Sequence, residues 1–182
     1  MSARFILLDS TPLGLLSHPQ GSPIVRSITE WADGLISAKD RIIVPAITHY
    51  EVRRELLRAG KAQGLLRLEE FTKAVPGRYL PLTDNALQLA AQLWADSRMD
   101  GKPTSSPESL DVDVILAAQA LTFGPSAADI VVATSNSRRL SRLSPALIGA
   151  KSNRDCQAGS VSRSCAPSKI FCVQSSPGTK PN

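Results

Sequence analysis

The sequence lacks the features on which several common classes of protein depend. It has no run of about 18 apolar residues, so no membrane-spanning helix is expected. Its cysteines, Cys156, Cys165 and Cys172, are odd in number and have no zinc-ligand spacing, which argues against a disulfide framework or a zinc finger. The two histidines, His18 and His49, show no metal-binding spacing either. A GxGxxG motif, a Walker loop and a nucleophile elbow are also absent, so nothing indicates a dinucleotide-binding, P-loop or α/β-hydrolase function.

What is present is enough apolar material for one folded domain. The chain has 182 residues, of which 42% are hydrophobic although only 4% are aromatic. The apolar run that begins at Phe5 reaches Asp9 after four residues, which is too short for the apolar region of a secretory signal. We therefore expect a cytoplasmic protein.

The positive charge is concentrated near the C-terminus. The net charge is +5, and residues 145–182 contain five of the 21 basic residues but only one of the 16 acidic residues. The same segment contains all three cysteines and loses the helical periodicity. We therefore expect a nearly neutral folded domain over 1–144 and a basic, Ser/Pro/Cys-containing tail over 145–182. The tail is expected to be disordered or atypical, and only residues 169–173 could form a strand there.

Short apolar runs alternate with helical patterns along the domain. Runs without polar alternation are typical of strands that are buried on both faces of a parallel sheet, and here they cover 5–8, 41–44 and 130–133. Apolar residues at helical spacing predict helices over 24–38, 47–59, 62–74, 84–98 and from Leu110 to about 121. Thr83 is expected to cap one helix and Gly60 to end another. This alternation predicts an α/β fold with a mostly parallel central sheet.

Acidic residues follow or accompany the predicted strands. Asp9 comes directly after the first strand, and Glu51 lies in the helix after the second. Asp111 and Asp113 open the helix before the last strand, which Asn136 follows. Because ligands of open parallel sheets bind at the carboxyl ends of the strands, these side chains are expected to converge on one edge.

A cluster of carboxylates requires a compensating positive charge, because like charges at close range disfavour ionisation. Mg²⁺ prefers oxygen ligands and is commonly held by one or two carboxylates together with substrate phosphates. The pattern therefore suggests a metal-dependent phosphodiesterase that acts on nucleic acid. Asp111 and Asp113 differ by about 200° around a helix and cannot share a face. We assign Asp113 as a ligand, and Asp111 as either an accessory ligand or a cap.

Each of these residues also has a simpler interpretation. Asp9 precedes Ser10-Thr11-Pro12, and its role could be limited to capping the next helix. Glu51 could form an exposed pair with Arg54, three residues further on. Asn136 could mark a turn. The order of the acids along the fold, rather than any one of them, supports a site.

Four segments carry a resemblance to a known family. They are Leu7-Leu8-Asp9-Ser10, the run from Pro45 to Leu56 that includes Tyr50-Glu51-Val52-Arg53-Arg54, the run from Leu110 to Ala120, and Val131 to Asn136. In this order, over about residues 3–143, they resemble the PIN-domain family and within it the VapC-like ribonuclease toxins of bacterial toxin–antitoxin pairs.

The resemblance implies a three-layer α/β/α domain and cleavage of RNA at an acidic site that depends on Mg²⁺ (or Mn²⁺). Asp9, Glu51 and Asp113 match the first three motif acids and would hold the metal, while Asn136 would assist. The function expected is that of a metal-dependent endoribonuclease, the toxin of a toxin–antitoxin pair.

RNA is then the expected substrate, with Arg53, Arg54 or Lys102 positioning its backbone. Binding through phosphates would be salt-dependent. The resemblance also implies a cognate antitoxin protein as a partner and a possible homodimer, for which exposed apolar positions on the helices between 47 and 74 could supply the face.

The fourth motif departs from the family pattern. The family often has an acid one or three residues after the Asn, where this chain has Ser137 and Arg139, and Ala46 stands where related sequences often have Glu. A catalytically weakened module that binds RNA or an antitoxin without cleavage is therefore the alternative. A phosphoacceptor receiver domain fits less well, because Asp9 has no acidic neighbour and Ser135-Asn136 stands where a lysine is needed.

Overall fold

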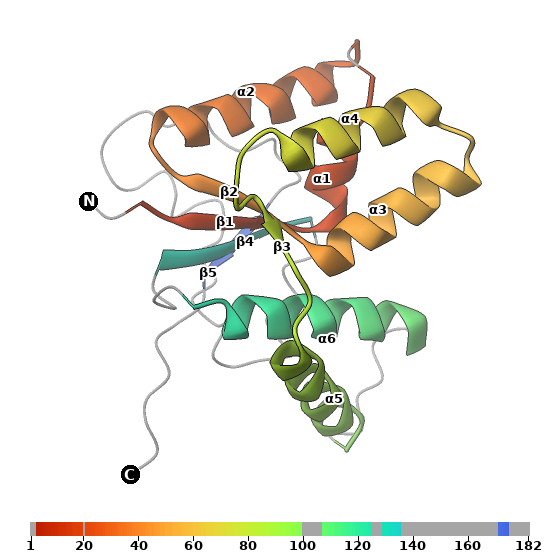
Figure 1. The fold of residues 1–182 in the computed structure, drawn as a ribbon, viewed down its shortest axis with the longest axis vertical. Coiled ribbons are helices and arrows are strands. Elements are labelled where there is room, and N and C mark those ends of the chain that lie inside the picture. The colour runs from red at the N-terminus through yellow and green to blue at the C-terminus, as the bar shows by residue number, and fades with distance from the viewer. Residues whose placement is uncertain (1–2, 20, 100–106, 125–128, 136–170, 175–182) are drawn as a thin grey trace.

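The protein is one mostly parallel sheet between two layers of helices (Figure 1). This computed structural model describes residues 3–19, 21–99, 107–124, 129–135 and 171–174. The elements are β1 (Phe5–Leu8), α1 (Ser10–Leu16), α2 (Pro23–Ser37), β2 (Arg41–Pro45), α3 (Ala46–Arg58), α4 (Ala62–Lys73), β3 (Tyr79–Leu80), α5 (Asp84–Met99), α6 (Pro107–Thr122), β4 (Ile130–Thr134) and β5 (Phe171–Gln174).

The strand order in the sheet is β3-β2-β1-β4-β5. The first four strands are parallel, and β5 pairs antiparallel with β4. Leu8 in β1 is opposite Ala133 in β4, so the two central strands end at the same edge. The expected mostly parallel α/β architecture is thereby confirmed, and this register fixes where the acidic residues meet.

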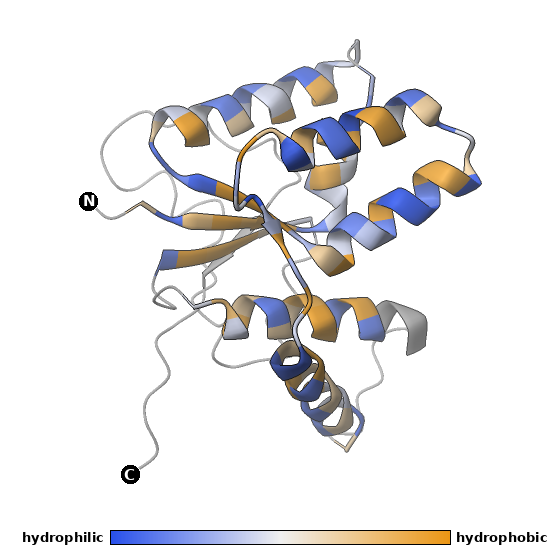
Figure 2. Ribbon diagram, viewed as in Figure 1, coloured by the Kyte–Doolittle hydropathy of each residue, from blue (hydrophilic) through white to orange (hydrophobic). Residues whose placement is uncertain are grey.

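Helices cover both faces of the sheet. In Figure 1, α1, α2, α3 and α4 lie on one side and α5 and α6 on the other. Alternate strand residues separate into two cores: Leu7 and Val132 pack toward α5 and α6, whereas Leu8 and Val131 pack toward α1, α2 and α4. Figure 2 shows the resulting pattern, with hydrophobic central strands and helices that are hydrophobic on one side only. The three-layer α/β/α arrangement therefore follows from strands that are apolar on both faces.

Local signals in the sequence define several helix ends. The Thr83 hydroxyl accepts a hydrogen bond from the Ala86 N–H at 3.2 Å and caps α5 as expected. Gly60 has a φ of 63° just after α3, which confirms it as the residue that ends this helix. Ser22 caps α2 by accepting a hydrogen bond from the Val25 N–H at 3.3 Å.

One helix start and two strands add to or refine the prediction. The helix α6 begins at Pro107 rather than Leu110, because proline suits the first helical turn, where its missing N–H is not needed. Tyr79–Leu80 forms a short edge strand, β3. This strand has only two residues, which is too short for a recognisable strand pattern in the sequence. Phe171–Gln174 of the tail forms β5, overlapping the one stretch of the tail with strand character. The expected boundary at residue 144 stays a prediction.

Some predictions concern residues outside the described ranges. The sequence also predicts a short last helix after Asn136, and these residues lie outside the described ranges. Within the described part, no helix is long and apolar enough to cross a membrane.

Candidate functional site

Asp9 lies at the carboxyl end of the central strand β1 and also begins α1. Its carboxylate Oδ1 accepts a hydrogen bond from the Ser10 N–H at 2.6 Å, which is the cap of α1. Its backbone N–H donates to the Ala133 carbonyl of β4 at 3.0 Å. The simpler interpretation of Asp9 as a helix cap is therefore correct. The side chain also makes a second contact, through its other oxygen.

The second carboxylate oxygen of Asp9 faces β4. The Thr134 hydroxyl, on a residue with no exposed surface, donates to Asp9 Oδ2 at 2.5 Å. Beside this pair, the hydroxyls of Thr11 and Ser135 lie 2.9 Å apart. Ser10 and Thr134, which follow β1 and end β4, thus bond to the two oxygens of one carboxylate and hold it in a single orientation. Asn136 was the residue predicted for the site in this segment, and Thr134 was not among the predicted site residues.

Glu51 lies on α3, which starts directly after β2. Its side chain is 24% exposed, and its Oε1 lies 3.7 Å from an Arg54 guanidinium nitrogen. The expected (i, i+3) pair is therefore present. It is a long, partly exposed contact that contributes little to stability, so a nearby phosphate or cation could replace it.

Asp111 and Asp113 lie near the start of α6, which packs against α3. Asp111 is exposed, whereas Asp113 is half-buried between the buried residues Val112 and Val114. Asp113 has an interaction of its own within the protein. The two aspartates differ in exposure as the helical geometry predicted.

The topology brings these carboxylates toward one edge of the sheet. In Figure 1 the strands β1 and β2 end on the side where α3 extends outward and where the first half of α6 lies opposite it. Carboxylate donors suit a hard divalent cation. Across the described ranges, however, no three His, Cys, Asp or Glu side chains come close enough together to form a ready metal site. The described side chains by themselves thus provide fewer than three ligands at any one point.

The arginines proposed to contact RNA already have partners on the protein surface. Arg53 forms a hydrogen-bonded ion pair with Glu69 of α4. Arg54 lies 5.5 Å above the ring of Tyr50 in addition to its contact with Glu51. Lys102 and Asn136 lie outside the described residues. A phosphate would therefore have to compete with a carboxylate for Arg53 and for Arg54.

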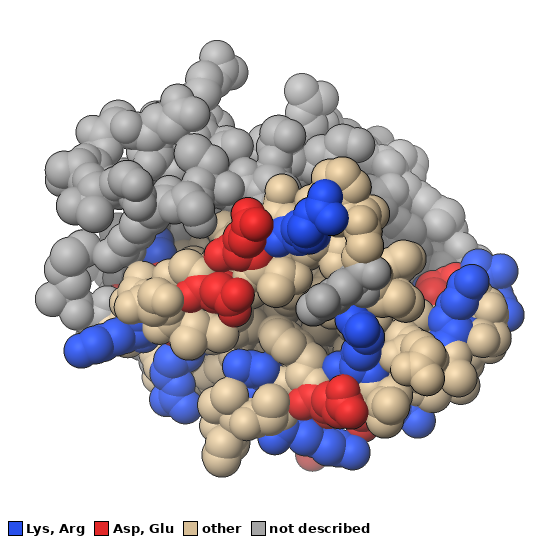
Figure 3. Space-filling model, turned by 90° about the horizontal axis from the view of Figure 1, so that it is seen from above, with Lys and Arg blue, Asp and Glu red and all other residues tan. Residues whose placement is uncertain are grey.

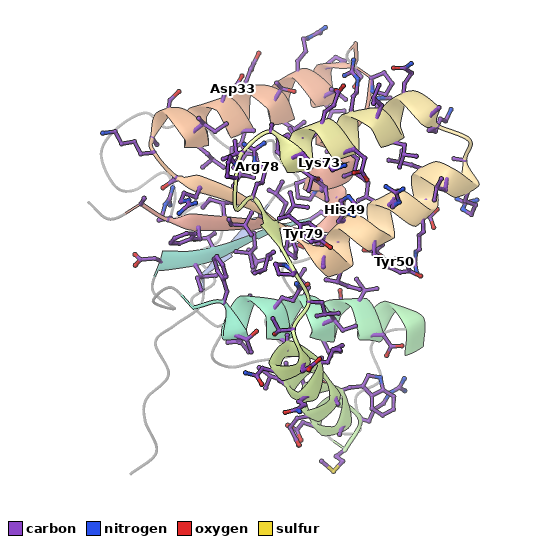
Figure 4. All side chains as sticks on the ribbon, viewed as in Figure 1. Asp33, His49, Tyr50, Lys73, Arg78 and Tyr79 are labelled. Carbon is purple, nitrogen blue, oxygen red and sulfur yellow. The ribbon has the colours of Figure 1, made fainter. Side chains whose placement is uncertain are left out.

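A charged cluster between α3 and α4 was not predicted as such. Glu69 accepts from Arg53, lies 2.9 Å from the Lys73 ammonium and lies 3.4 Å from His49 Nε2. The hydrogen bond from Lys73 lowers the pKa of Glu69. Burial lowers the pKa of His49 despite the attraction of Glu69, and the positive charge of Arg53 adds to that effect. Figure 4 shows His49, Lys73 and Tyr79 on the same side of the molecule.

Gln119 is a second residue with a structural role that was not predicted. It is 1% exposed in the middle of α6, and its side-chain amide bonds to backbone atoms of α3 and of the segment at β3. The signal was available, since a polar residue within the apolar run Val114–Ala120 must find partners when it is buried.

The outer face of α2 and α4 does not present charge of one sign. Figure 3, which looks onto the molecule from above, shows acidic side chains among the Lys and Arg side chains of that face. This mixed surface gives no electrostatic reason to place a nucleic acid there.

Comparison with known proteins gives similarity at the level of structure. No family model matches the sequence, and no curated protein matches it. A chain in the crystal structure of FitAcB from Neisseria gonorrhoeae is 22% identical with a TM-score of 0.54, covering 76% of this chain and 92% of that one. A chain in the structure of FitAB bound to the IR36 DNA fragment is 24% identical with a TM-score of 0.52, covering 76% and 90%. This protein therefore has the PIN-like three-layer α/β/α fold and shares it with the FitAB structures.

Proposed function

We propose that this protein is a cytoplasmic, metal-dependent endoribonuclease that acts as the toxin of a toxin–antitoxin pair. The observation that carries the proposal is the placement of Asp9 at the end of the central strand β1, oriented by Thr134 of β4. Helices bearing Glu51 and Asp113 lie toward the same edge of the sheet. The fold shared with the FitAB structures supports this assignment.

Asp9, Glu51 and Asp113 would hold Mg²⁺ or Mn²⁺, with Asp111 as an accessory ligand. Mg²⁺ commonly uses one or two protein carboxylates and completes its shell with water and phosphate oxygens, so the scarcity of preformed ligands is compatible with binding together with RNA. The bound ion would activate a water and stabilise the leaving oxygen of the phosphodiester. When RNA and the ion bind, release of Glu51 from Arg54 would leave Glu51 available to the ion and Arg54 available to a phosphate.

The other residues would bind and orient RNA. Arg53, Arg54 and Lys102 would contact backbone phosphates, and Asn136 would orient a water or a phosphate oxygen. Thr134 and Ser10 hold the Asp9 carboxylate in place through hydrogen bonds, so it need not reorganise when substrate arrives.

A module that binds RNA or an antitoxin without cleaving is the second candidate. Two observations favour it: the fourth motif acid is replaced by Ser137 and Arg139, and Arg53 and Arg54 are engaged in ion pairs. Titration with Mn²⁺ separates the two candidates, because a degraded site would bind the ion weakly and show no cleavage.

The partners proposed are RNA, a cognate antitoxin protein and a second copy of this chain. Exposed apolar side chains on the α3–α4 hairpin offer a face for a dimer, with Tyr50 and Leu57 each 57% exposed and Leu66 53% exposed. Light scattering coupled to size exclusion would give the mass in solution, and Leu57→Glu should convert a dimer on this face into a monomer.

Cleavage of RNA by the purified protein tests the function. We expect cleavage with Mn²⁺, loss of cleavage with EDTA, and at least a hundredfold loss in Asp9→Asn and Asp113→Asn. Asp33→Asn is the matched control, since Asp33 is an exposed acid on α2 and outside the site (Figure 4). Cleavage that survives both site substitutions would overturn the assignment.

A further inference from the structure

Gln119 connects three segments through one buried side chain. Its Oε1 accepts a hydrogen bond from the Ile47 N–H of α3 at 3.2 Å. Its Nε2 donates to the carbonyl of Leu80 at 3.1 Å and to that of Pro81 at 3.3 Å. A single amide on α6 thus fixes both the beginning of α3 and the end of β3.

The beginning of α3 depends on this contact. The first N–H groups of a helix have no partner within the helix and usually bond to a capping side chain. Here the residue before α3 is Pro45, whose side chain makes no capping hydrogen bond, and Ile47 is buried. Gln119 therefore supplies from α6 an acceptor that the local sequence does not provide.

The same contact lies within reach of the candidate site. Glu51 follows Ile47 by four residues and so lies on the same side of α3, one turn further along. Ile47 packs in one core cluster with Val112 and Val114, the two neighbours of Asp113 on α6. A shift of α3 along α6 would therefore change the distance between Glu51 and Asp113.

We propose that Gln119 is a positioning residue that sets the separation of Glu51 on α3 from Asp113 on α6. The proposal rests on the proposed function for its catalytic consequence, whereas the attachment of α3 to α6 can be measured independently. The competing explanation is that Gln119 only satisfies buried backbone groups. In that case activity would follow stability and nothing else.

A cavity of about 200 Å³ beside Gln119 makes variants at this position practicable. Its walls include Leu80, Pro81, Ala86 and Phe123. An unbranched replacement of similar length therefore has room to settle without forcing the helices apart. Gln119→Met keeps the length and removes every hydrogen bond. Gln119→Glu keeps an oxygen acceptor for the Ile47 N–H but loses the Nε2 donor to the Leu80 and Pro81 carbonyls.

The experiment combines amide hydrogen exchange of Ile47, measured by NMR, with cleavage of a fluorogenic oligoribonucleotide in Mn²⁺. Gln119→Met should accelerate Ile47 exchange at least tenfold and lower kcat at least tenfold while KM changes less than threefold. Gln119→Glu should accelerate Ile47 exchange less than Gln119→Met does, because it keeps the acceptor for this N–H. The control, Thr72→Val, removes a buried hydroxyl-to-carbonyl bond within α4 and should alter neither quantity.

Two results would overturn the proposal: unchanged Ile47 exchange in Gln119→Met, or a kcat that follows the unfolding midpoint across all three variants. A wild-type protein that cleaves no RNA would overturn the proposed function instead. Ile47 exchange then decides the attachment alone, with greater acceleration in Gln119→Met than in Gln119→Glu supporting it and equal exchange in both excluding it.

Discussion

The hydrogen bond between Thr134 and Asp9 joins side chains 125 residues apart in the sequence. Thr134 is fully buried, and its hydroxyl has a charged acceptor at 2.5 Å. Hydrogen bonds to charged groups contribute more than neutral ones, and a buried acceptor that loses its donor carries a desolvation cost. This contact is thus both structural and, under the proposed function, a means of orienting the carboxylate.

Thr134→Val should therefore destabilise the protein by about 1.5–3 kcal/mol, because it keeps the shape of the side chain and removes the donor. RNA cleavage should fall about tenfold in the same variant under the proposed function. Urea unfolding gives the free energy. Thr29→Val, which removes a hydroxyl bonded within α2, is the control and should stay within about 0.5 kcal/mol of wild type. An equal loss of unfolding free energy in Thr134→Val and Thr29→Val would contradict a special contribution of the Thr134–Asp9 hydrogen bond.

His49 makes stability depend on pH near neutrality. Burial lowers the pKa of His49 below 6.5, so the folded protein binds this proton less readily than the unfolded chain does. Protonation then favours unfolding, and stability should fall as the pH drops through 6.5 toward the lowered pKa. Glu69 acts in the same direction only below its ordinary value of 4.5, because its own pKa is also lowered.

His49→Gln should flatten the dependence of unfolding free energy on pH between about 7.5 and 5.5. Urea unfolding at several pH values measures this slope. The groups that face His49 are Glu69, Arg53, Lys73 and Tyr79, and all are kept in the variant. An equal slope in wild type and variant would assign the effect to another group.

At the scale of the elements, the free edge of β4 is covered by β5. The backbone of Phe171–Gln174 pairs antiparallel with β4 over four residues, from Val131↔Gln174 to Thr134↔Phe171. An uncovered strand edge leaves N–H and C=O groups available to another chain. The four residues of β5 therefore protect the sheet beside the candidate site.

A chain that ends after residue 170 should expose this edge and self-associate. Static light scattering over hours at constant temperature would show growth that a chain ending after residue 174 does not show, since the longer chain keeps β5. Stable monodisperse behaviour of both chains would mean that β5 does not protect β4.

The elements that the sequence predicted well are those with a signal in their own residues. The buried strands β1, β2 and β4 appear as continuous apolar runs, and α5 shows clear helical spacing with a capping threonine. The short strand β3 has no such signal, because it exists through backbone pairing with β2. Contacts between elements were equally hidden: the pairing of Arg53 with Glu69 and the bonds of Gln119 depend on how helices pack.

At the scale of the whole molecule, two cores share one sheet. Leu116 lies in the core on the α5–α6 side, and Trp31 of α2 lies in the core on the opposite side. Successive residues of the same strands belong to one core or the other. The two cores should therefore unfold together, because each packs against the same strands.

Leu116→Ala should destabilise the protein by about 2–5 kcal/mol. In a Trp94→Phe background, which leaves Trp31 as the fluorescent reporter, the unfolding midpoint seen across the sheet should fall together with that seen by circular dichroism. A Trp31 midpoint that does not move would show that the two layers unfold independently.

The central position of β1 has a consequence during translation. One of the two strands that flank Phe5–Leu8 is made about 125 residues later, which at about 5–20 residues per second takes roughly 6–25 s. For that time the nascent chain has its middle strand open on one flank. Growth conditions that slow elongation would lengthen this interval and increase the demand for chaperones before the sheet is complete.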